Sequence, residues 1–179
     1  MGIWRRAGLQ ADGKCSRLMD GFLAMVTLVA ALGCGVVAGV FFAFSAFVMK
    51  AFDRLPASRA VAVMQEINTA APTPAFMVVL FGTALACGVL VPWSLFVWGE
   101  PSAVYLLVGG GLYLIFAIGL TVVYHVPRNE ALARVEASGT EAESRWSGYV
   151  AGWTVWNHLR FAGALAASAS LVMALVFST

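Results

Sequence analysis

The sequence predicts an all-α fold, a bundle of four transmembrane helices with a short amphipathic helix in the first long loop. The first observation is composition, because 61% of the 179 residues are hydrophobic and only 11% are charged, whereas an ordinary soluble domain carries roughly a quarter charged residues. The second is that the charges are clumped. They leave four charge-free intervals, at residues 21–49, 67–99, 101–127 and 161–179. Each interval is long enough to cross a bilayer, which takes about 20 apolar residues.

Composition also excludes several classes of protein. The net charge of +2, without a cluster of Lys and Arg among aromatic residues, gives no surface suited to nucleic acid. The three cysteines form no CxxC pair and no dense pattern, which excludes a disulfide scaffold or a zinc-finger type of site. We therefore expect a small protein whose partners are a lipid bilayer and a small molecule.

The charge-free intervals define the domain organisation. We expect an N-terminal tail at residues 1–17 and a single membrane domain at residues 18–179. The expected spans are about 18–49, 76–98, 102–125 and 148–177. The first apolar run continues to Met49, whereas the apolar core of a signal peptide has about 7 to 15 residues. We therefore expect a retained helix in an integral, multi-pass protein of the bacterial cytoplasmic membrane.

The connections between the spans predict the topology. The link at residues 99–101 is so short that the second and third spans must be antiparallel neighbours. In the first long loop, Pro56 begins a short helix at about 59–68, which Pro72 and Pro74 end. We expect this helix to lie on the membrane surface or to cap the bundle. Both longer loops then lie on one side and both termini on the other, and the Lys and Arg counts do not decide which side is cytoplasmic.

Two glycine patterns favour close packing of helices. Gly35 and Gly39 have the GxxxG spacing, which we interpret as packing within the bundle rather than as a dedicated dimer motif. These glycines do not decide whether the protein forms a homo-oligomer. The run Gly109–Gly111 lacks a GxxxxGK[ST] or GxGxxG frame. It therefore predicts the close approach of another helix, or local flexibility, rather than a phosphate loop.

Polar side chains on the fourth span fall on one helical face. Polar groups within a membrane usually face the bundle interior or a wet cavity. At 3.6 residues per turn, this face carries Tyr149, Trp153, Trp156, Asn157 and Arg160. His158 projects about 100° away from Asn157 and can face a different neighbour. Arg160 has a simpler interpretation, an anchor that reaches to the membrane interface.

The antiparallel layout brings both histidines, His125 at the end of the third span and His158, to one mouth of the bundle. Other segments reach the same mouth with Phe44, Ser45, Gln65, Asn68 and Asn129. The sequence thus predicts an aromatic-walled pocket suited to a flat, mostly apolar ligand. Two imidazoles could also begin a copper or iron site, although three protein ligands are usual in catalytic metal sites.

Four segments of the chain have a familiar pattern. They are Gly39-Val-Phe-Phe-Ala-Phe-Ser-Ala-Phe-Val-Met49, Met64-Gln-Glu-Ile-Asn68, Val126-Pro-Arg-Asn-Glu-Ala-Leu132 and Trp146-x-x-Tyr149-x-x-x-Trp153-Thr-Val-Trp-Asn-His-Leu-Arg160. Taken in order, they resemble the anthrone oxygenase-like family of small four-helix membrane proteins, from about Leu18 onward. The family commonly has Asn-x-Pro-x-Asn at the end of the third span, where this chain has His125-Val-Pro-Arg-Asn129. This departure leaves the role of His125 open.

The resemblance implies an oxidoreductase that converts anthrones, aromatic polyketides, to anthraquinones with molecular oxygen and no other required cofactor. A base can form a delocalised carbanion from the anthrone methylene, and the carbanion can pass an electron to oxygen. We expect His158 as the base, Arg160 or Asn157 to stabilise the oxyanion, and His125 as a further catalytic candidate. The expected substrate-binding residues are Phe44, Ser45, Gln65, Asn68, Asn129, Tyr149, Trp153 and Trp156.

Two alternatives stay open at this point. One is a copper- or iron-dependent membrane oxidase of another small molecule, in which His125 and His158 bind the metal. The other is a non-enzymatic membrane binding or assembly protein, in which the same aromatic side chains anchor the helices.

Overall fold

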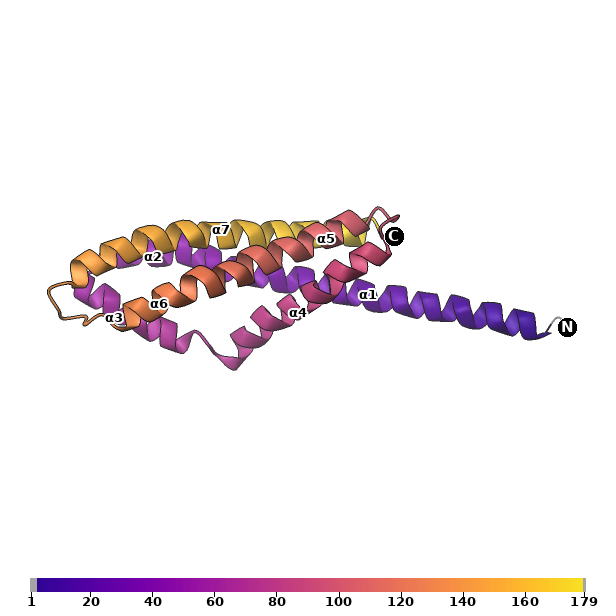
Figure 1. The fold of residues 1–179 in the computed structure, drawn as a ribbon, viewed down its shortest axis with the longest axis horizontal. Coiled ribbons are helices and arrows are strands. Elements are labelled where there is room, and N and C mark those ends of the chain that lie inside the picture. Colours follow the sequence, from indigo (N-terminus) through magenta and orange to yellow (C-terminus); the bar gives the residue numbers. More distant parts are fainter. Residues whose placement is uncertain (1–2, 179) are drawn as a thin grey trace.

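The computed structural model describes the backbone of residues 3–178 and the side chains of residues 19–178. Four helical segments in this part of the chain are long and apolar enough to cross a membrane, which confirms the predicted all-α bundle. They are Met19–Phe52, Pro74–Phe96, Ala103–Ala133 and Ala142–Val176. Both termini lie at one end of the bundle and the two longer loops at the other (Figure 1). This arrangement agrees with the predicted antiparallel order.

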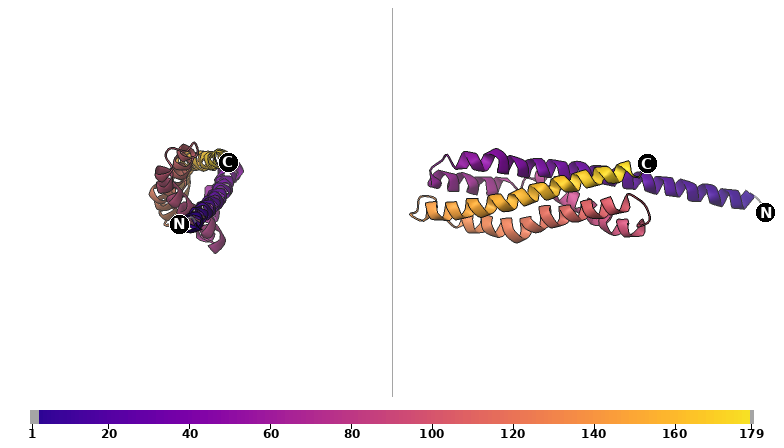
Figure 2. Two further views of the ribbon diagram at one scale, coloured as in Figure 1. Left: turned by 90° about the vertical axis from the view of Figure 1, so that its right-hand side faces the viewer. Right: turned by 90° about the horizontal axis from the view of Figure 1, so that it is seen from above.

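The first two spans are separated by a shorter helix. The first is formed by α1 (Ile3–Ala43), the π-helical stretch η1 (Phe44–Val48) and α2 (Met49–Phe52). The start of α1 includes most of the predicted tail and projects beyond the bundle (Figures 1 and 2). The shorter helix is α3 (Ala57–Ala70), and the second span is α4 (Pro74–Phe96).

The third span is interrupted by π-helical turns, whereas the fourth is continuous. The third is formed by α5 (Ala103–Leu112), η2 (Tyr113–Gly119), η3 (Thr121–His125) and α6 (Val126–Ala133). The fourth is α7 (Ala142–Val176). The helix continues past residue 125, the predicted end of the third span, because Pro127 occupies the first turn of α6. A proline is tolerated there, since its missing N–H has no helical partner in any case.

The second loop is shorter than predicted, because α7 begins at Ala142 and not near Gly148. Ala142 and Trp146 are buried, and the Trp146 ring lies 5.8 Å from that of Phe52 in an edge-on contact. Burial of this first turn against the end of the first span outweighs the polar composition of the segment.

Helix length separates the spans into two groups. The first, third and fourth segments have 34, 31 and 35 residues, or roughly 45 to 55 Å at 1.5 Å per residue. The 23 residues of α4 extend about 35 Å, close to the roughly 30 Å of a bilayer core. Three helices therefore extend past α4 at the loop end.

The short helix α3 fills the space beyond α4. It packs lengthwise against α6 and α7, and it runs along the bundle rather than across its end (Figures 1 and 2). It thus neither caps the bundle nor lies flat on the membrane, which corrects both expectations. Ala60, Val61 and Met64 are its buried residues, because these positions face the longer helices.

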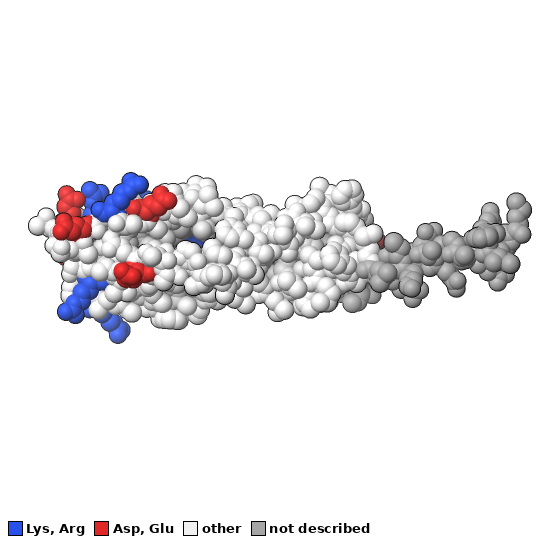
Figure 3. Space-filling model, turned by 90° about the horizontal axis from the view of Figure 1, so that it is seen from below, with Lys and Arg blue, Asp and Glu red and all other residues white. Residues whose placement is uncertain are grey.

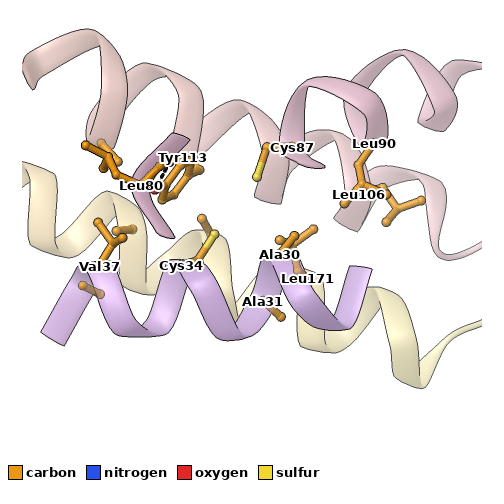
Figure 4. Packing of buried hydrophobic residues seen from close by; sticks show 14 of the residues in the cluster. Ala30, Ala31, Cys34, Val37, Leu80, Cys87, Leu90, Leu106, Tyr113 and Leu171 are labelled. Atoms are coloured by element: carbon orange, nitrogen blue, oxygen red, sulfur yellow. Dashed lines mark hydrogen bonds between the residues drawn. The ribbon is translucent and has the colours of Figure 1, made fainter. Parts of the chain in front are cut away.

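The centre of the bundle is apolar and closely packed. Figure 4 shows Cys34 of α1 opposite Cys87 of α4, with Leu80 and Tyr113 beside them. Both thiols are free and buried. The hydroxyl of Tyr113 donates a hydrogen bond of 3.0 Å to the carbonyl of Leu80, so that its one polar atom is satisfied within the core.

The triple glycine lies where three helices meet, as its pattern predicted. A Cβ on Gly109 would lie 2.8 Å from Leu171 of α7, and one on Gly110 would lie 2.7 Å from Val91 of α4. A Cβ on Gly111 would meet nothing within 4 Å. The first two glycines therefore allow α5 to approach a helix on each side.

We expect Gly109→Ala and Gly110→Ala each to lower the free energy of unfolding by about 1–3 kcal/mol, the usual cost of overpacking. Gly111→Ala is the matched control and should be neutral or slightly stabilising, since alanine is the better helix former. Unfolding of the detergent-solubilised protein measures all three. Equal stability of Gly110→Ala and Gly111→Ala would contradict the close approach.

Single cysteines introduced at Thr140 and at Ser178, in a Cys15→Ser background, test the topology. We expect a membrane-impermeant thiol reagent to label one of them in sealed vesicles and the other only after the membrane is opened. Labelling of both from the same side would reject the four-span arrangement.

Candidate functional site

The loop-side half of α7 presents polar and aromatic side chains to the bundle interior. Tyr149, Trp153, Asn157 and Arg160 are all buried, as the helical periodicity predicted. Trp156 differs, because it is 37% exposed and lies against Tyr124 with ring centres 4.9 Å apart. The inward face of α7 therefore forms one side of a site, and Trp156 lies at its edge.

Asn157 joins α7 to the first span. Its Nδ2 donates to the carbonyl of Phe41 at 2.8 Å and to the hydroxyl of Ser45 at 2.7 Å. Both acceptors lie at or just before the π-helical stretch η1. In an α-helix each backbone N–H donates to the carbonyl four residues earlier, and in a π-helix it donates to the carbonyl five residues earlier. A carbonyl beside the change is therefore free to accept a side-chain donor.

Arg160 lies one helical turn further along the same face. It is 7% exposed, and its guanidinium carbon lies 3.7 Å from the ring centre of Phe41. Nη1 lies 3.5 Å from Oδ1 of Asn157, which is the long limit of a hydrogen bond. This exposure is too small for a side chain that reaches water. The interpretation of Arg160 as an anchor at the membrane interface is therefore corrected.

No acidic side chain pairs with Arg160 in the described part of the chain. Every Asp and Glu among residues 19–178 is exposed, and the one ion pair found there is between Arg145 and Glu141 at 3.1 Å. Figure 3 shows charged side chains gathered at the loop end and, beyond them, a recess with Lys or Arg atoms at its bottom. Arg160 is the one buried Lys or Arg among residues 19–178.

His125 enters the site from the end of η3. Its ring is buried and meets that of Trp153 edge-on, with centres 5.1 Å apart. Nδ1 lies 3.1 Å from the carbonyl of Leu120. A carbonyl can only accept a hydrogen bond, so Nδ1 carries the proton and the neutral ring keeps its lone pair on Nε2. Nε2 is buried and makes no hydrogen bond of ordinary geometry, although the backbone of Trp153 lies beside the ring.

Asn129 holds the aromatic residues of α7 in place. Its Oδ1 accepts hydrogen bonds from the Tyr149 hydroxyl at 2.8 Å and from Nε1 of Trp153 at 3.2 Å. Phe44 of η1 covers the other side of Trp153, with ring centres 5.6 Å apart. These contacts make a fixed aromatic wall beside His125.

Buried polar atoms without a partner concentrate here. Four such side-chain atoms occur among residues 19–178, namely Asn68 Nδ2, His125 Nε2, Thr154 Oγ1 and Arg160 Nε. Asn68 lies beside the Tyr149 hydroxyl, although its Nδ2 makes no hydrogen bond of ordinary geometry. Native proteins leave few buried polar groups unpaired, so the gathering of unpaired atoms near one face of α7 indicates a ligand site.

Two predicted site residues lie apart from this cluster. His158 is exposed and projects about 140° around α7 from Trp153, the residue that His125 contacts. The structure therefore does not bring the two histidines together. Gln65 donates to the carbonyls of Leu132 and Val135, both at 2.9 Å, and so uses both amide protons to fasten α3 to the end of α6.

The alternative of a metal held by both histidines does not fit this arrangement. Among the described side chains, no group of three or more His, Cys, Asp and Glu residues lies close enough to hold a metal ion. A groove of about 720 Å³ does lie nearby, between α6, the second loop and the start of α7. Its lining includes Arg128, Arg134 and, at its inner end, Tyr149.

Sequence reasoning missed the parts of the site that come from the backbone. The carbonyl of Leu120 orients His125, and the carbonyl of Phe41 holds Asn157. Both lie next to π-helical stretches, which are frequent at functional sites. Residue types alone carry no signal for such turns.

The fold and the site define a multi-pass membrane protein with a buried aromatic and polar site. The sequence model of one family, described as anthrone oxygenase, matches residues 73–170, which is more than half of the chain. The protein belongs to the anthrone oxygenase family, and this membership indicates an oxygenase-like role. The match includes His125, Asn157 and Arg160 but not α1. Neither a comparison with curated proteins nor one with solved structures finds a match.

We expect Asn157→Leu to lower the free energy of unfolding by about 1–3 kcal/mol, because it leaves buried polar groups of the first span without a donor. His158→Leu, at the next position, faces outward and should change stability little. Thermal unfolding in detergent compares the two variants. If His158→Leu were the more damaging change, the orientation of α7 described above would be wrong.

Proposed function

We propose that the protein is a membrane-embedded oxygenase that oxidises the methylene group of a flat aromatic ketone, an anthrone, to a quinone with molecular oxygen. Family membership supports the oxygenase class. The aromatic wall of Phe44, Tyr149 and Trp153 supports a flat substrate, since offset and edge-on contacts between rings are favourable. The proposed location is the bacterial cytoplasmic membrane, which suits a protein with four helical spans.

The observation that carries the proposal is the state of His125. Its Nδ1–H is directed to a backbone carbonyl, and Nε2 makes no hydrogen bond of ordinary geometry within a buried aromatic site. A neutral imidazole with an unused lone pair is a general base. We therefore place the base at His125 rather than at His158, whose side chain is exposed.

The proposed reaction begins when Nε2 of His125 removes one proton from the methylene carbon. The electron pair spreads to the ketone oxygen and forms an enolate, which gives one electron to oxygen. The resulting radical and superoxide combine through a new C–O bond, and the peroxide takes the proton from His125. The base then removes the second methylene proton as the O–O bond breaks and hydroxide leaves. One CH₂ group and one O₂ thus become one ketone and one water.

Arg160 and Asn157 have different roles in this proposal. Arg160 stabilises the enolate oxygen, because it is a cation in a site of low dielectric constant. Both amide protons of Asn157 are already donated, to Phe41 and Ser45, so it has none left for substrate. Its Oδ1 faces the guanidinium instead. Asn157 therefore acts as a positioning residue, and the same holds for Asn129 beneath Trp153.

We expect His125→Gln to lower the rate of oxygen consumption with an anthrone by about two to four orders of magnitude, the usual contribution of a general base. His158→Gln should keep near-normal turnover. The wild-type rate should also fall on acidification, because a protonated imidazole cannot accept the substrate proton. An oxygen electrode measures each variant after its folding is checked by gel filtration. The opposite order of the two variants would return the base to His158.

Chelation separates this mechanism from the metal-dependent alternative. We expect dialysis of the purified protein against a chelator to leave oxygen consumption unchanged, since no step above uses a metal. A loss of activity that copper or iron restores would favour the metal-dependent oxidase. An absence of anthrone-dependent oxygen consumption in the folded wild-type protein would favour the binding or assembly role.

A further inference from the structure

The buried charge of Arg160 has no compensation within the described part of the protein. An arginine side chain stays protonated in proteins, and this one is 7% exposed. Its contacts are the face of Phe41 at 3.7 Å and the amide oxygen of Asn157 at 3.5 Å. Neither group carries a negative charge. Burial of an unpaired ion is costly, so the free protein holds a cation that an anion would stabilise.

The arrangement around Arg160 restricts what such an anion can be. Its Nε is buried and without a partner, while Nη1 already lies against Asn157. The free edge of a guanidinium presents parallel N–H groups that match two neighbouring oxygen atoms. Phe41 lies against the face of this group, and Trp153 of the aromatic wall, with Phe44 beside it, lies about two turns of α7 away. The surroundings thus favour a planar ligand with an anionic oxygen at one edge.

We infer that the recess gives this ligand a route, because Lys or Arg atoms lie at its bottom and Arg160 is the one buried Lys or Arg among residues 19–178. Figure 3 shows that the surface around the recess is uncharged, whereas the charged residues lie further toward the loop end. The recess lies at the level of the bundle where α3 passes into α4 (Figures 1 and 3), which is where the span of bilayer length begins. The uncharged rim at this level suits a ligand that enters from the lipid side.

We propose that Arg160 is an anion-binding residue that makes the protein select aromatic acids, with the acidic group beside the ring ketone, over neutral aromatic ketones. This inference rests on the proposed function, which supplies the aromatic ketone. It also extends that function. Arg160 is positively charged before any enolate forms, so it binds a negative charge that the free ligand already carries. The substrate class is therefore an anthrone with a carboxylate next to the ketone.

Two quinones of the same shape test the selection without any turnover. Anthraquinone-1-carboxylate is ionised at neutral pH, and anthraquinone-1-carboxamide is its neutral counterpart. Titration calorimetry in a non-ionic detergent measures both affinities. We expect the carboxylate to bind the wild-type protein at least about tenfold more tightly, a factor within the range of a charged hydrogen bond. Equal affinities would overturn the proposal even if the protein oxidises anthrones.

Substitutions test whether Arg160 causes the preference for the carboxylate over the carboxamide. We expect Arg160→Gln to remove the preference for the carboxylate, measured as the ratio of the carboxylate and carboxamide affinities of the same variant. Arg160→Lys keeps the charge and should keep part of the preference. Arg145→Gln is the matched control on the same helix, because Arg145 is exposed and lines the outer groove. Loss of the preference in Arg145→Gln, with Arg160→Gln unaffected, would move the anion to that groove and overturn the proposal.

A lipid phosphate could supply the same negative charge, and the membrane composition separates the two sources. The titrations are repeated in nanodiscs of phosphatidylcholine and of phosphatidylglycerol. We expect the carboxylate preference to remain in both. If phosphatidylglycerol abolishes it, the anionic ligand of Arg160 is a lipid headgroup, and the proposed substrate selection is wrong. If oxygen consumption is absent but the carboxylate preference persists, the proposed oxygenation fails while the anion site stands.

Discussion

The structure depends on the side-chain amide of Asn157, which joins the two longest helices deep inside the bundle. Hydrogen bonds from Nδ2 to the Phe41 carbonyl and the Ser45 hydroxyl set the rotation of α7 against the first span. In an apolar environment these donors have no alternative partner, so the register is strongly preferred. The rotation that satisfies Asn157 also turns Trp153 toward His125 and Arg160 toward Phe41. One polar contact therefore orients both the Trp153 ring beside His125 and the Arg160 guanidinium.

The site combines polar groups that pair with one another and buried polar atoms that have no hydrogen-bond partner. Tyr149, Trp153 and Asn129 satisfy one another, whereas His125 Nε2 and Arg160 Nε stay unpaired. Unpaired polar groups at membrane depth are costly, and they are found where a function requires them. The paired residues stabilise the fold, and the unpaired ones are the groups that a bound molecule would use. The same face of α7 thus contains both paired polar groups and the unpaired Nε of Arg160.

Much of the fold could be predicted from the sequence, because the charge-free intervals and the helical period of α7 are properties of residue type. They predicted four spans and the burial of Tyr149, Trp153, Asn157 and Arg160. The relative rotation of neighbouring helices could not be predicted, since it depends on side-chain contacts and on π-helical turns that add a residue to the repeat. This is why His125 faces the site and His158 does not. The position of α3 depends similarly on the free space beyond α4.

The central claim is that His125 removes a proton from the aromatic substrate, and exchange of that proton under anaerobic conditions tests it most directly. The methylene protons of an anthrone are followed by NMR in D₂O, with wild-type protein and with His125→Gln. Without oxygen the carbanion can only take back a proton from the solvent, so neither electron transfer nor a later step affects the rate. We expect the wild-type protein to accelerate deuterium incorporation well above the uncatalysed rate, and the variant not to do so. Equal exchange rates with and without the wild-type protein would contradict the account.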